Sequence, residues 1–497
     1  MMRSGVLLCV YGWLLVVFTN AQTNPPPTVQ AVVEALRSND NAKALALAQE
    51  VARTHPHDAR AWIFQGIALQ GLQRPEESLQ AFEHALEIDP GNVAALEGAA
   101  QLEFQAGKAD ALPFLEKLVE LNPNDQTSHA MMAALAFKRK DCAAAVAHYQ
   151  ECPDLVQSNV PALSQFGACL FRLNRAEEGL AKFQRIAELR PQDSEALYYL
   201  GLAQYRSHHD KDAIQTLLPL TEDASEKQRK RALNLIAAAY EADQQTPQAV
   251  SALQKAIALA PGDIDNYLDL ATISLNHEAF KVGVDVLNAG LRVMPDSARL
   301  YLQRGVLEVQ LEDYDAANTD FRKAADLSPL DSASSVALGI SLLQQNKVDE
   351  SLQVVKLRLA KEPDDPTLNY LLAELLIRKG VQPGTPSFQR AQAAAQRAVR
   401  NKPDLTVAQD VLTQLYLRSG ETALAEKTAR LALASDHDDQ TALYNLIVCL
   451  RKRGDRNELP QLVQRLAEIT AGLREQEKAR AQFKLVEEQA AEGSEKK

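Results

Sequence analysis

Apolar and polar positions along most of this chain repeat with the period of a helix rather than of a strand. Leu163, Phe166, Gly167 and Leu170 follow one another at intervals of three, one and three residues, with polar or small residues between them. Spacing of this kind predicts an amphipathic helix with one buried stripe. The helices that it predicts come in pairs of about three to four turns each. No segment shows the alternation of a half-buried strand, so the pattern predicts an all-α chain.

Prolines recur along the chain at a nearly fixed interval. Pro56 and Pro90 lie 34 residues apart, and the three intervals between Pro261 and Pro363 are each 34 residues. Proline ends a helix because it lacks an amide hydrogen and disfavours helical geometry in the residue before it. A fixed period of this length predicts an array of stacked units instead of one globular core. The full series is Pro56, Pro90, Pro123, Pro191, Pro261, Pro295, Pro329, Pro363 and Pro403.

Within each unit, bulky and small residues occupy fixed positions. Counting Ala298 as position 1 places Tyr301, Gly305, Ala317, Phe321, Ala324 and Pro329 at positions 4, 8, 20, 24, 27 and 32. Counting Ala59 as position 1 places Trp62, Gly66, Ser78, Phe82, Ala85 and Pro90 at the same positions, and the units from Val160, Lys230 and Ile264 agree. This order of aromatic, small, small, aromatic, small and proline residues resembles the tetratricopeptide repeat.

The resemblance implies a right-handed α-α superhelical solenoid of about twelve helical hairpins. Small residues at positions 8 and 20 would let the two helices of a hairpin approach closely, since larger side chains there would hold them apart. We assign residues 22–57 to an N-terminal cap or first repeat, 58–455 to the repeat array, and 456–472 to a C-terminal capping helix. Irregular spacing predicts hinges near 125–158, 221–226 and 381–387. The stretch at 473–497 is expected to be a charged helical or frayed tail.

The N-terminus carries the features of an export signal. Arg3 precedes an uncharged apolar run from Val6 to Phe18, and small residues follow it up to Ala21. This pattern predicts a signal peptide over residues 1–21 that is cleaved near Ala21, and a periplasmic or extracellular mature protein. A retained membrane anchor is the alternative, although the run is shorter than the roughly 20 residues that span a bilayer. We expect no membrane span in the mature chain.

Charge and candidate chemistry add little support for other classes of function. The formal net charge is −12, with no sustained basic cluster, and nucleic-acid binding usually leaves a basic footprint. The close pairs His55/His57 and His208/His209 lack the spacing of a zinc site and are interpreted as turn residues. No nucleophile turn or phosphate-binding glycine loop is present. We therefore expect no enzyme activity, no cofactor, no metal and no nucleic-acid partner.

The cysteines leave a disulfide open. Cys142 and Cys152 flank one expected helix, about 15 Å apart at the helical rise, which is beyond disulfide reach. Cys152 ends that helix and Cys169 lies in the next one, so these two could meet. The favoured interpretation is that both are small buried apolar residues rather than a bridge.

The family resemblance assigns the concave face to positions 2, 5, 9, 12 and 13 of each first helix. Tyrosine and arginine, which are frequent at binding hot spots, are common at these positions. Packing along the helix is the alternative role for each tyrosine. The carboxylate-clamp subset of the family uses Lys at position 5 and Asn at position 9, and this sequence does not support it. The candidate groove residues are Arg172, Tyr198, Tyr205, Arg206, Asn234, Tyr370, Arg378, Gln414, Arg418, Tyr444 and Arg451.

These features favour a non-enzymatic scaffold that binds peptide or helical segments of partner proteins in its groove. The expected setting is an exported or cell-envelope complex, with the partner unidentified. The alternative is a polysaccharide- or polymer-binding envelope assembly factor, which would use the same aromatic residues for stacking. The sequence does not fix the oligomeric state.

Overall fold

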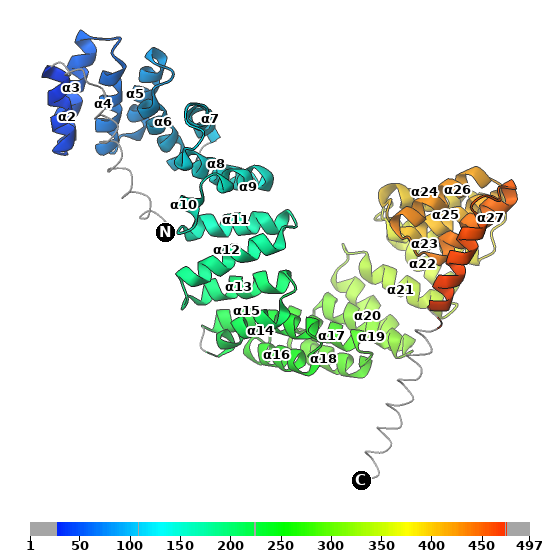
Figure 1. Cartoon of the computed structure of the whole chain (residues 1–497). Helices are drawn as coiled ribbons and strands as arrows, with labels where there is room; N and C mark the ends of the chain where they lie inside the picture. The colour runs from blue at the N-terminus through cyan, green and yellow to red at the C-terminus, as the bar shows by residue number, and fades with distance from the viewer. Residues whose placement is uncertain (1–26, 108, 223–224, 473, 475–497) are drawn as a thin grey trace. The chain divides into compact units, whose positions relative to one another are not determined.

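The computed structural model describes residues 27–107, 109–222, 225–472 and 474, and the chain divides into two compact units, one ending at Gln245 and one beginning at Thr246 (Figure 1). Unit 1 contains the helices α2 (Pro27–Arg37), α3 (Asn41–Thr54), α4 (Ala59–Gly71), α5 (Pro75–Ile88), α6 (Val93–Gln105), η2 (Ala109–Ala111), α7 (Leu112–Leu121), α8 (Gln126–Lys138), α9 (Cys142–Gln150), α10 (Pro153–Val156), α11 (Val160–Arg172), α12 (Ala176–Leu189), α13 (Ser194–Arg206), α14 (Asp210–Leu217), η3 (Leu218–Thr221) and α15 (Glu226–Ala242).

Unit 2 continues the same organisation. Its helices are α16 (Thr246–Leu259), α17 (Ile264–Asn276), α18 (Phe280–Val293), α19 (Ala298–Gln310), α20 (Tyr314–Leu327), α21 (Ala333–Gln344), α22 (Val348–Leu359), α23 (Pro366–Arg378), α24 (Pro386–Asn401), α25 (Thr406–Ser419), α26 (Thr422–Ser435) and α27 (Gln440–Arg453), followed by a helix over residues 459–472. The described residues contain no strand, which confirms the all-α prediction.

The turn inside each helical hairpin has a fixed backbone conformation. In unit 2, α19 ends at Gln310, Leu311 caps it, and Glu312 follows with a φ of 60°. A left-handed residue directly after the cap stops the first helix and lets the chain reverse. Glu312 is position 15 of its unit, and the residues at position 15 of the other units also have positive φ: Asn39, Gln73, Gly107, Lys140, Asn174, His208, Gln244, Glu278, Asn346, Gly380, Gly420 and Gly454. The repeat phase is therefore visible in the backbone itself.

Small residues let the two helices of a hairpin approach, as the sequence predicts. A Cβ atom built on Gly66 of α4 would lie 2.7 Å from the ring of Phe82 on α5. The Ser78 hydroxyl, at position 20, donates a hydrogen bond of 2.7 Å to the Gly66 carbonyl oxygen, at position 8. Ser351 and Gly339 repeat this bond at 2.7 Å in unit 2. Positions 8 and 20 thus face each other, and a larger side chain at position 8 would displace the aromatic residue.

The irregular stretches predicted as hinges have the following structures. Residues 125–158 hold α8, α9 and the additional short helix α10, and 381–387 join α23 to α24. Helix η3 ends at Thr221, where the stretch 221–226 begins. At the C-terminal end, the helix at 459–472 packs Leu459, Leu462, Leu466 and Ile469 against the core of α26 and α27. The predicted signal at 1–21 and, apart from Arg474, the predicted tail at 473–497 lie outside the described residues.

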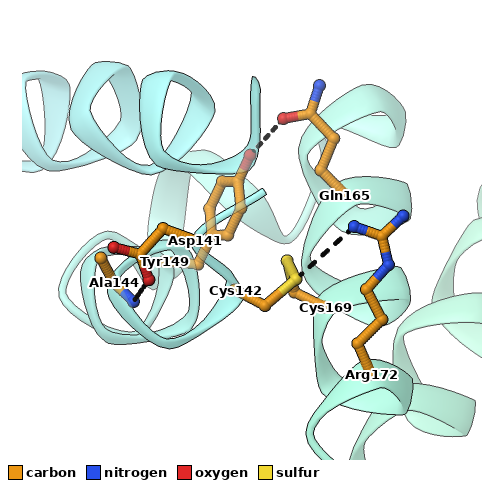
Figure 2. The surroundings of a disulfide bond; sticks show 7 residues. All are labelled: Asp141, Cys142, Ala144, Tyr149, Gln165, Cys169 and Arg172. Atoms are coloured by element: carbon orange, nitrogen blue, oxygen red, sulfur yellow. Dashed lines mark hydrogen bonds between the residues drawn. A yellow bond between two sulfur atoms is a disulfide. The ribbon is translucent and has the colours of Figure 1, made fainter. Parts of the chain in front are cut away.

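A disulfide joins Cys142 at the start of α9 to Cys169 in α11, with their Cα atoms 4.9 Å apart (Figure 2). The favoured interpretation of unbridged cysteines was therefore wrong, and so was the choice of Cys152 as the possible partner of Cys169. Because neighbouring helices of the array run in opposite directions, the start of α9 lies beside the end of α11, where Cys169 is. Cys152 is a buried free cysteine, and its Sγ lies 3.3 Å from the His148 carbonyl oxygen.

Candidate functional site

The first helices of neighbouring hairpins lie against each other within each unit. In unit 2, each first helix contacts the next one along the series α17, α19, α21, α23, α25 and α27. In unit 1, the same contacts join α2 to α4, α4 to α6, and α13 to α15. In the part of the chain that the structure describes, no comparably extensive contact joins one second helix to another. Closer spacing of the first helices curves each array toward them. The first helices therefore line its inner face.

The unit 1 candidates lie on three of these helices. Arg172 and Arg206 are exposed at the ends of α11 and α13, and Tyr198, Tyr205 and Asn234 are half-buried. The Arg172 guanidinium lies 3.9 Å from the Cys142 sulfur and 6.0 Å from the centre of the Phe137 ring. Figure 2 shows this side chain beside the disulfide. Its surroundings therefore give Arg172 a packing role at the irregular repeat.

An arginine between two tyrosines is the most developed part of the unit 1 face. The Arg231 guanidinium of α15 lies 4.0 Å from the ring centre of Tyr198 and 5.7 Å from that of Tyr199, both on α13. Glu195 is 3.8 Å from the same guanidinium. Arg231 occupies position 2 of its unit, which is one of the groove positions, yet the sequence analysis did not single it out. The cluster joins two first helices and offers both aromatic and charged surface.

The unit 2 candidates form rows across three helices that contact one another in series. Position 5 is Tyr370 on α23, Asp410 on α25 and Tyr444 on α27. One helical turn further on, position 9 is Glu374, Gln414 and Val448. Arg378, Arg418 and Arg451 then lie at the ends of the same helices. The face is therefore aromatic and acidic at one edge and basic at the other.

The charged side chains of this face lie near enough to Tyr370 to affect the pKa of its phenol. Burial raises the pKa of its phenol, and the neighbouring charges of Glu374, Arg378 and Asp410 also act on it. Arg378 Nε donates to Glu374 Oε1 at 2.9 Å. Tyr444 is 58% exposed, whereas Tyr370 and Gln414 are half-buried and Arg418 and Arg451 are exposed. The six unit 2 candidates thus lie on contacting helices, and Tyr444 and the two distal arginines are accessible.

Asp410 is a site residue that the sequence analysis missed. The residue is only 8% exposed, and within the described part of the chain its Oδ1 has no hydrogen-bond partner. Burial, followed by the charge of Asp439 and a hydrogen bond with it, raises the pKa of the Asp410 carboxyl to about 8. Its place at position 5 was a usable signal, but the choice of tyrosine and arginine as typical hot-spot residues passed over it.

A second charged group in unit 2 joins α18, α19 and α20. Arg304 of α19 donates to both carboxylate oxygens of Asp320 on α20, at 2.6 and 2.7 Å, and to Asn288 of α18 at 2.6 Å. Burial, together with the Asp320 charge, raises the pKa of Glu308 to about 7. This network ties three consecutive helices together.

The histidines make local contacts. His209 Nε2 lies 3.1 Å from Glu177 Oε1, and His55 Nδ1 lies 3.0 Å from the Thr54 hydroxyl. Among the residues that the structure describes, no three His, Cys, Asp or Glu side chains are grouped to hold a metal ion. No described helix combines the length and the apolar character needed to cross a bilayer.

Comparison with known families agrees with the fold. Residues 32–163 match the family described as "Cytochrome c-type biogenesis protein H TPR domain", and residues 170–218 and 308–380 match two families described as "Tetratricopeptide repeat". Stacked hairpins with this phase define an α-solenoid. The chain is a tetratricopeptide repeat protein, and this fold supports a protein-interaction scaffold.

Similarity to individual proteins is low. The "Protein CTR9 homolog" of Arabidopsis thaliana is 24% identical over 309 residues, covering 60% of this chain and 28% of that protein. Mouse "Tetratricopeptide repeat protein 16" is 26% identical over 319 residues, covering 56% of this chain and 40% of that protein. The chain thus spans two fifths or less of either curated relative. The crystal structure of yeast Tom70 superposes with a TM-score of 0.43 at 16% identity, covering 86% of this chain and 96% of that one.

Proposed function

We propose that this chain is a non-enzymatic scaffold that binds segments of partner proteins along the inner face of its first helices. The observation that carries the proposal is the unit 2 face, where Tyr370 and Tyr444 share position 5 and an arginine lies at the end of each of three contacting helices. Tyrosine and arginine provide large contact area and directed charge, and they dominate binding hot spots. A row of such residues along a curved array suits an extended peptide or a helix.

The proposed setting is an oxidising compartment, reached by export and cleavage near Ala21. The Cys142–Cys169 disulfide supports this, because disulfides persist outside the reducing cytosol. The match of residues 32–163 to a TPR domain of a cytochrome c-type biogenesis protein supports a role in assembling other proteins. We therefore propose a periplasmic or extracellular complex as the setting of the scaffold.

Paired surface variants test the binding face. Tyr444→Ala with Arg418→Ala removes two inner-face side chains of unit 2. Leu357→Ser is the matched control, since Leu357 lies on the second helix α22 and is 66% exposed. The proposal predicts that a polypeptide copurifying with the wild-type chain is lost from the double variant and kept by the control. Equal retention by all three, or binding on a glycan array with no copurifying polypeptide, contradicts it.

A further inference from the structure

The carboxyl group of Asp410 lies buried without a cation. Asp410 is 8% exposed, and its Oδ1 has no hydrogen-bond partner among the residues that the structure describes. The charges that act on it most strongly are those of Asp439 and Asp436, both in or beside the turn that precedes α27. Asp439 caps α27 by accepting the backbone N–H of Ala442 at 3.0 Å. Asp439 and Asp436 therefore add negative charge near Asp410, at the boundary between α25 and α27.

The arginines on the same face either pair with another carboxylate or lie at the far end of their helices. Arg378, which acts on the phenol of Tyr370, is paired with Glu374 at 2.9 Å. Arg418 and Arg451 lie at the opposite end of their helices, two or more turns from position 5. Because a helix rises about 1.5 Å per residue, these guanidinium groups start roughly 10 Å away from the Asp410 row. An acidic cluster without its own cation is costly to bury unless something supplies one.

Tyrosines stand at the positions equivalent to Asp410 on both neighbouring helices. Tyr370 on α23 is half-buried, whereas Tyr444 on α27 is 58% exposed. The face of a tyrosine ring attracts ammonium and guanidinium groups. A carboxylate with a tyrosine on each side is a favourable environment for a basic side chain, particularly arginine, whose flat group both stacks and donates hydrogen bonds.

We propose that Asp410, with Tyr370 and Tyr444 on either side, forms the subsite for an arginine or lysine side chain of the bound partner segment. This inference rests on the proposed function, and it specifies the partner chemistry at one position. The basic side chain supplies the missing partner of Asp410 Oδ1 and compensates Asp436 and Asp439. Oδ1 is closed off from solvent in the free protein, so neighbouring side chains must move apart as the cation enters.

A random peptide library selected on the full-length chain tests the subsite. Asp410→Asn keeps the shape of the side chain but cannot ionise when a cation enters, and Asp326→Asn is the matched control, because Asp326 is exposed on the second helix α20. We expect the wild type and the control to enrich peptides with an arginine or lysine at one fixed place. Asp410→Asn should lose that preference. Circular dichroism and thermal melting establish that the variant is folded.

The strongest selected peptide is then measured with its basic residue replaced by glutamine. The substitution should weaken binding to the wild type about tenfold, as expected for a charge-assisted contact, and weaken binding to Asp410→Asn less than about twofold. Equal weakening for both proteins, or selected peptides without a conserved basic residue, overturns the subsite and leaves the proposed function intact. No enrichment by the wild type contradicts the proposed function itself, and the subsite with it.

Discussion

The hydroxyl of Tyr267 donates a 3.0 Å hydrogen bond to the carbonyl oxygen of Pro261, the proline that closes the preceding unit. Trp62 makes the same connection through Nε1 to Pro56 at 3.3 Å, and Asn369 through Nδ2 to Pro363 at 2.8 Å. In each case the donor is six residues after the proline, at position 4 of the next unit. Position 4 thus ties a first helix to the turn before it, and side chains of different size fill the same role.

Replacing Tyr267 with Phe removes the hydroxyl that donates this hydrogen bond to the Pro261 carbonyl oxygen. We expect the free energy of unfolding to fall by about 1 kcal/mol, the usual net value of one hydrogen bond. Tyr301→Phe is the control, since Tyr301 also occupies position 4 but its described contact is through the ring, which lies 5.4 Å from the Arg304 guanidinium. Urea unfolding measures both variants, and equal losses contradict the role of the bond.

Gly305→Ala tests the close approach inside a hairpin. The new Cβ would lie 2.6 Å from the ring of Phe321, so the ring or a helix must move. We expect a loss of about 1–3 kcal/mol, as for other overpacked cores. Gly262→Ala is the control, because a Cβ there meets nothing within 4 Å. A thermal melt in which both variants match the wild type would contradict the packing argument.

The disulfide predicts the number of reactive thiols. The chain has five cysteines, and pairing of Cys142 with Cys169 removes two of them. Denatured, unreduced protein should therefore label at Cys152 and Cys449, with a third label only if the segment containing Cys9 is retained. Mass spectrometry after alkylation distinguishes these results. Labelling of Cys142 and Cys169 without reductant would mean that the bridge is absent.

The same bridge predicts an effect on stability. Cys142→Ser should destabilise unit 1 by about 2–4 kcal/mol, because the unfolded chain regains the freedom of the closed loop. Cys152→Ser is a control that leaves the bridge in place, although it changes a buried side chain. Urea unfolding of oxidised wild type and variants measures the difference, and it should vanish when all samples are reduced.

Asp410 predicts a pH dependence of stability. Its raised pKa of about 8 means that the folded protein keeps a proton that the unfolded chain releases near pH 4. The folded state then binds more protons between these values, so stability falls as the pH rises from about 4 to about 8. Asp410→Asn removes this contribution and should be more stable than the wild type at pH 8 by about 2 kcal/mol or more.

At pH 4 the difference should be small, since Asp410 is then protonated in the folded wild type and about half protonated in the unfolded chain. Thermal or urea unfolding at both pH values measures the difference, with Asp326→Asn as the control. Glu308, with its pKa raised to about 7, contributes in the same direction to all three proteins and cancels in the comparison. A constant difference across the range would show that Asp410 does not titrate as described.

The sequence predicted those features of the fold that recur with the same type of residue in each repeat. Pro261, Gly66 and Phe82 reveal the repeat because each role needs a particular residue type. Proline ends a helix, glycine lets two helices approach, and the aromatic ring fills the space between them. The left-handed residue at position 15 escaped notice because residues such as Glu312 and His208 hold it in some units, although Gly107 and Asn174 show the residue types that favour positive φ in others. Aligning the units by their fixed phase would have brought these glycines and asparagines to one position.

Contacts between residues far apart in the sequence were harder to predict. The bridge between Cys142 and Cys169 depends on the opposite directions of α9 and α11 and on the extra turn of α10, which a residue spacing alone does not give. On the binding face, Arg231 and Asp410 occupied groove positions but were passed over in favour of residues with stronger hot-spot statistics. Their importance follows from neighbours on adjacent helices, which only the structure supplies.

Site-specific photocrosslinking in intact cells tests the central claim most directly. A photoreactive phenylalanine analogue replaces Tyr444 on the inner face of unit 2, or Leu431, which is 47% exposed on the second helix α26, as the control. If the first helices hold a partner segment, irradiation yields a discrete polypeptide adduct at Tyr444 and none at Leu431. Adducts of equal yield at the two positions, or adducts at Leu431 alone, would contradict a binding face on the first helices.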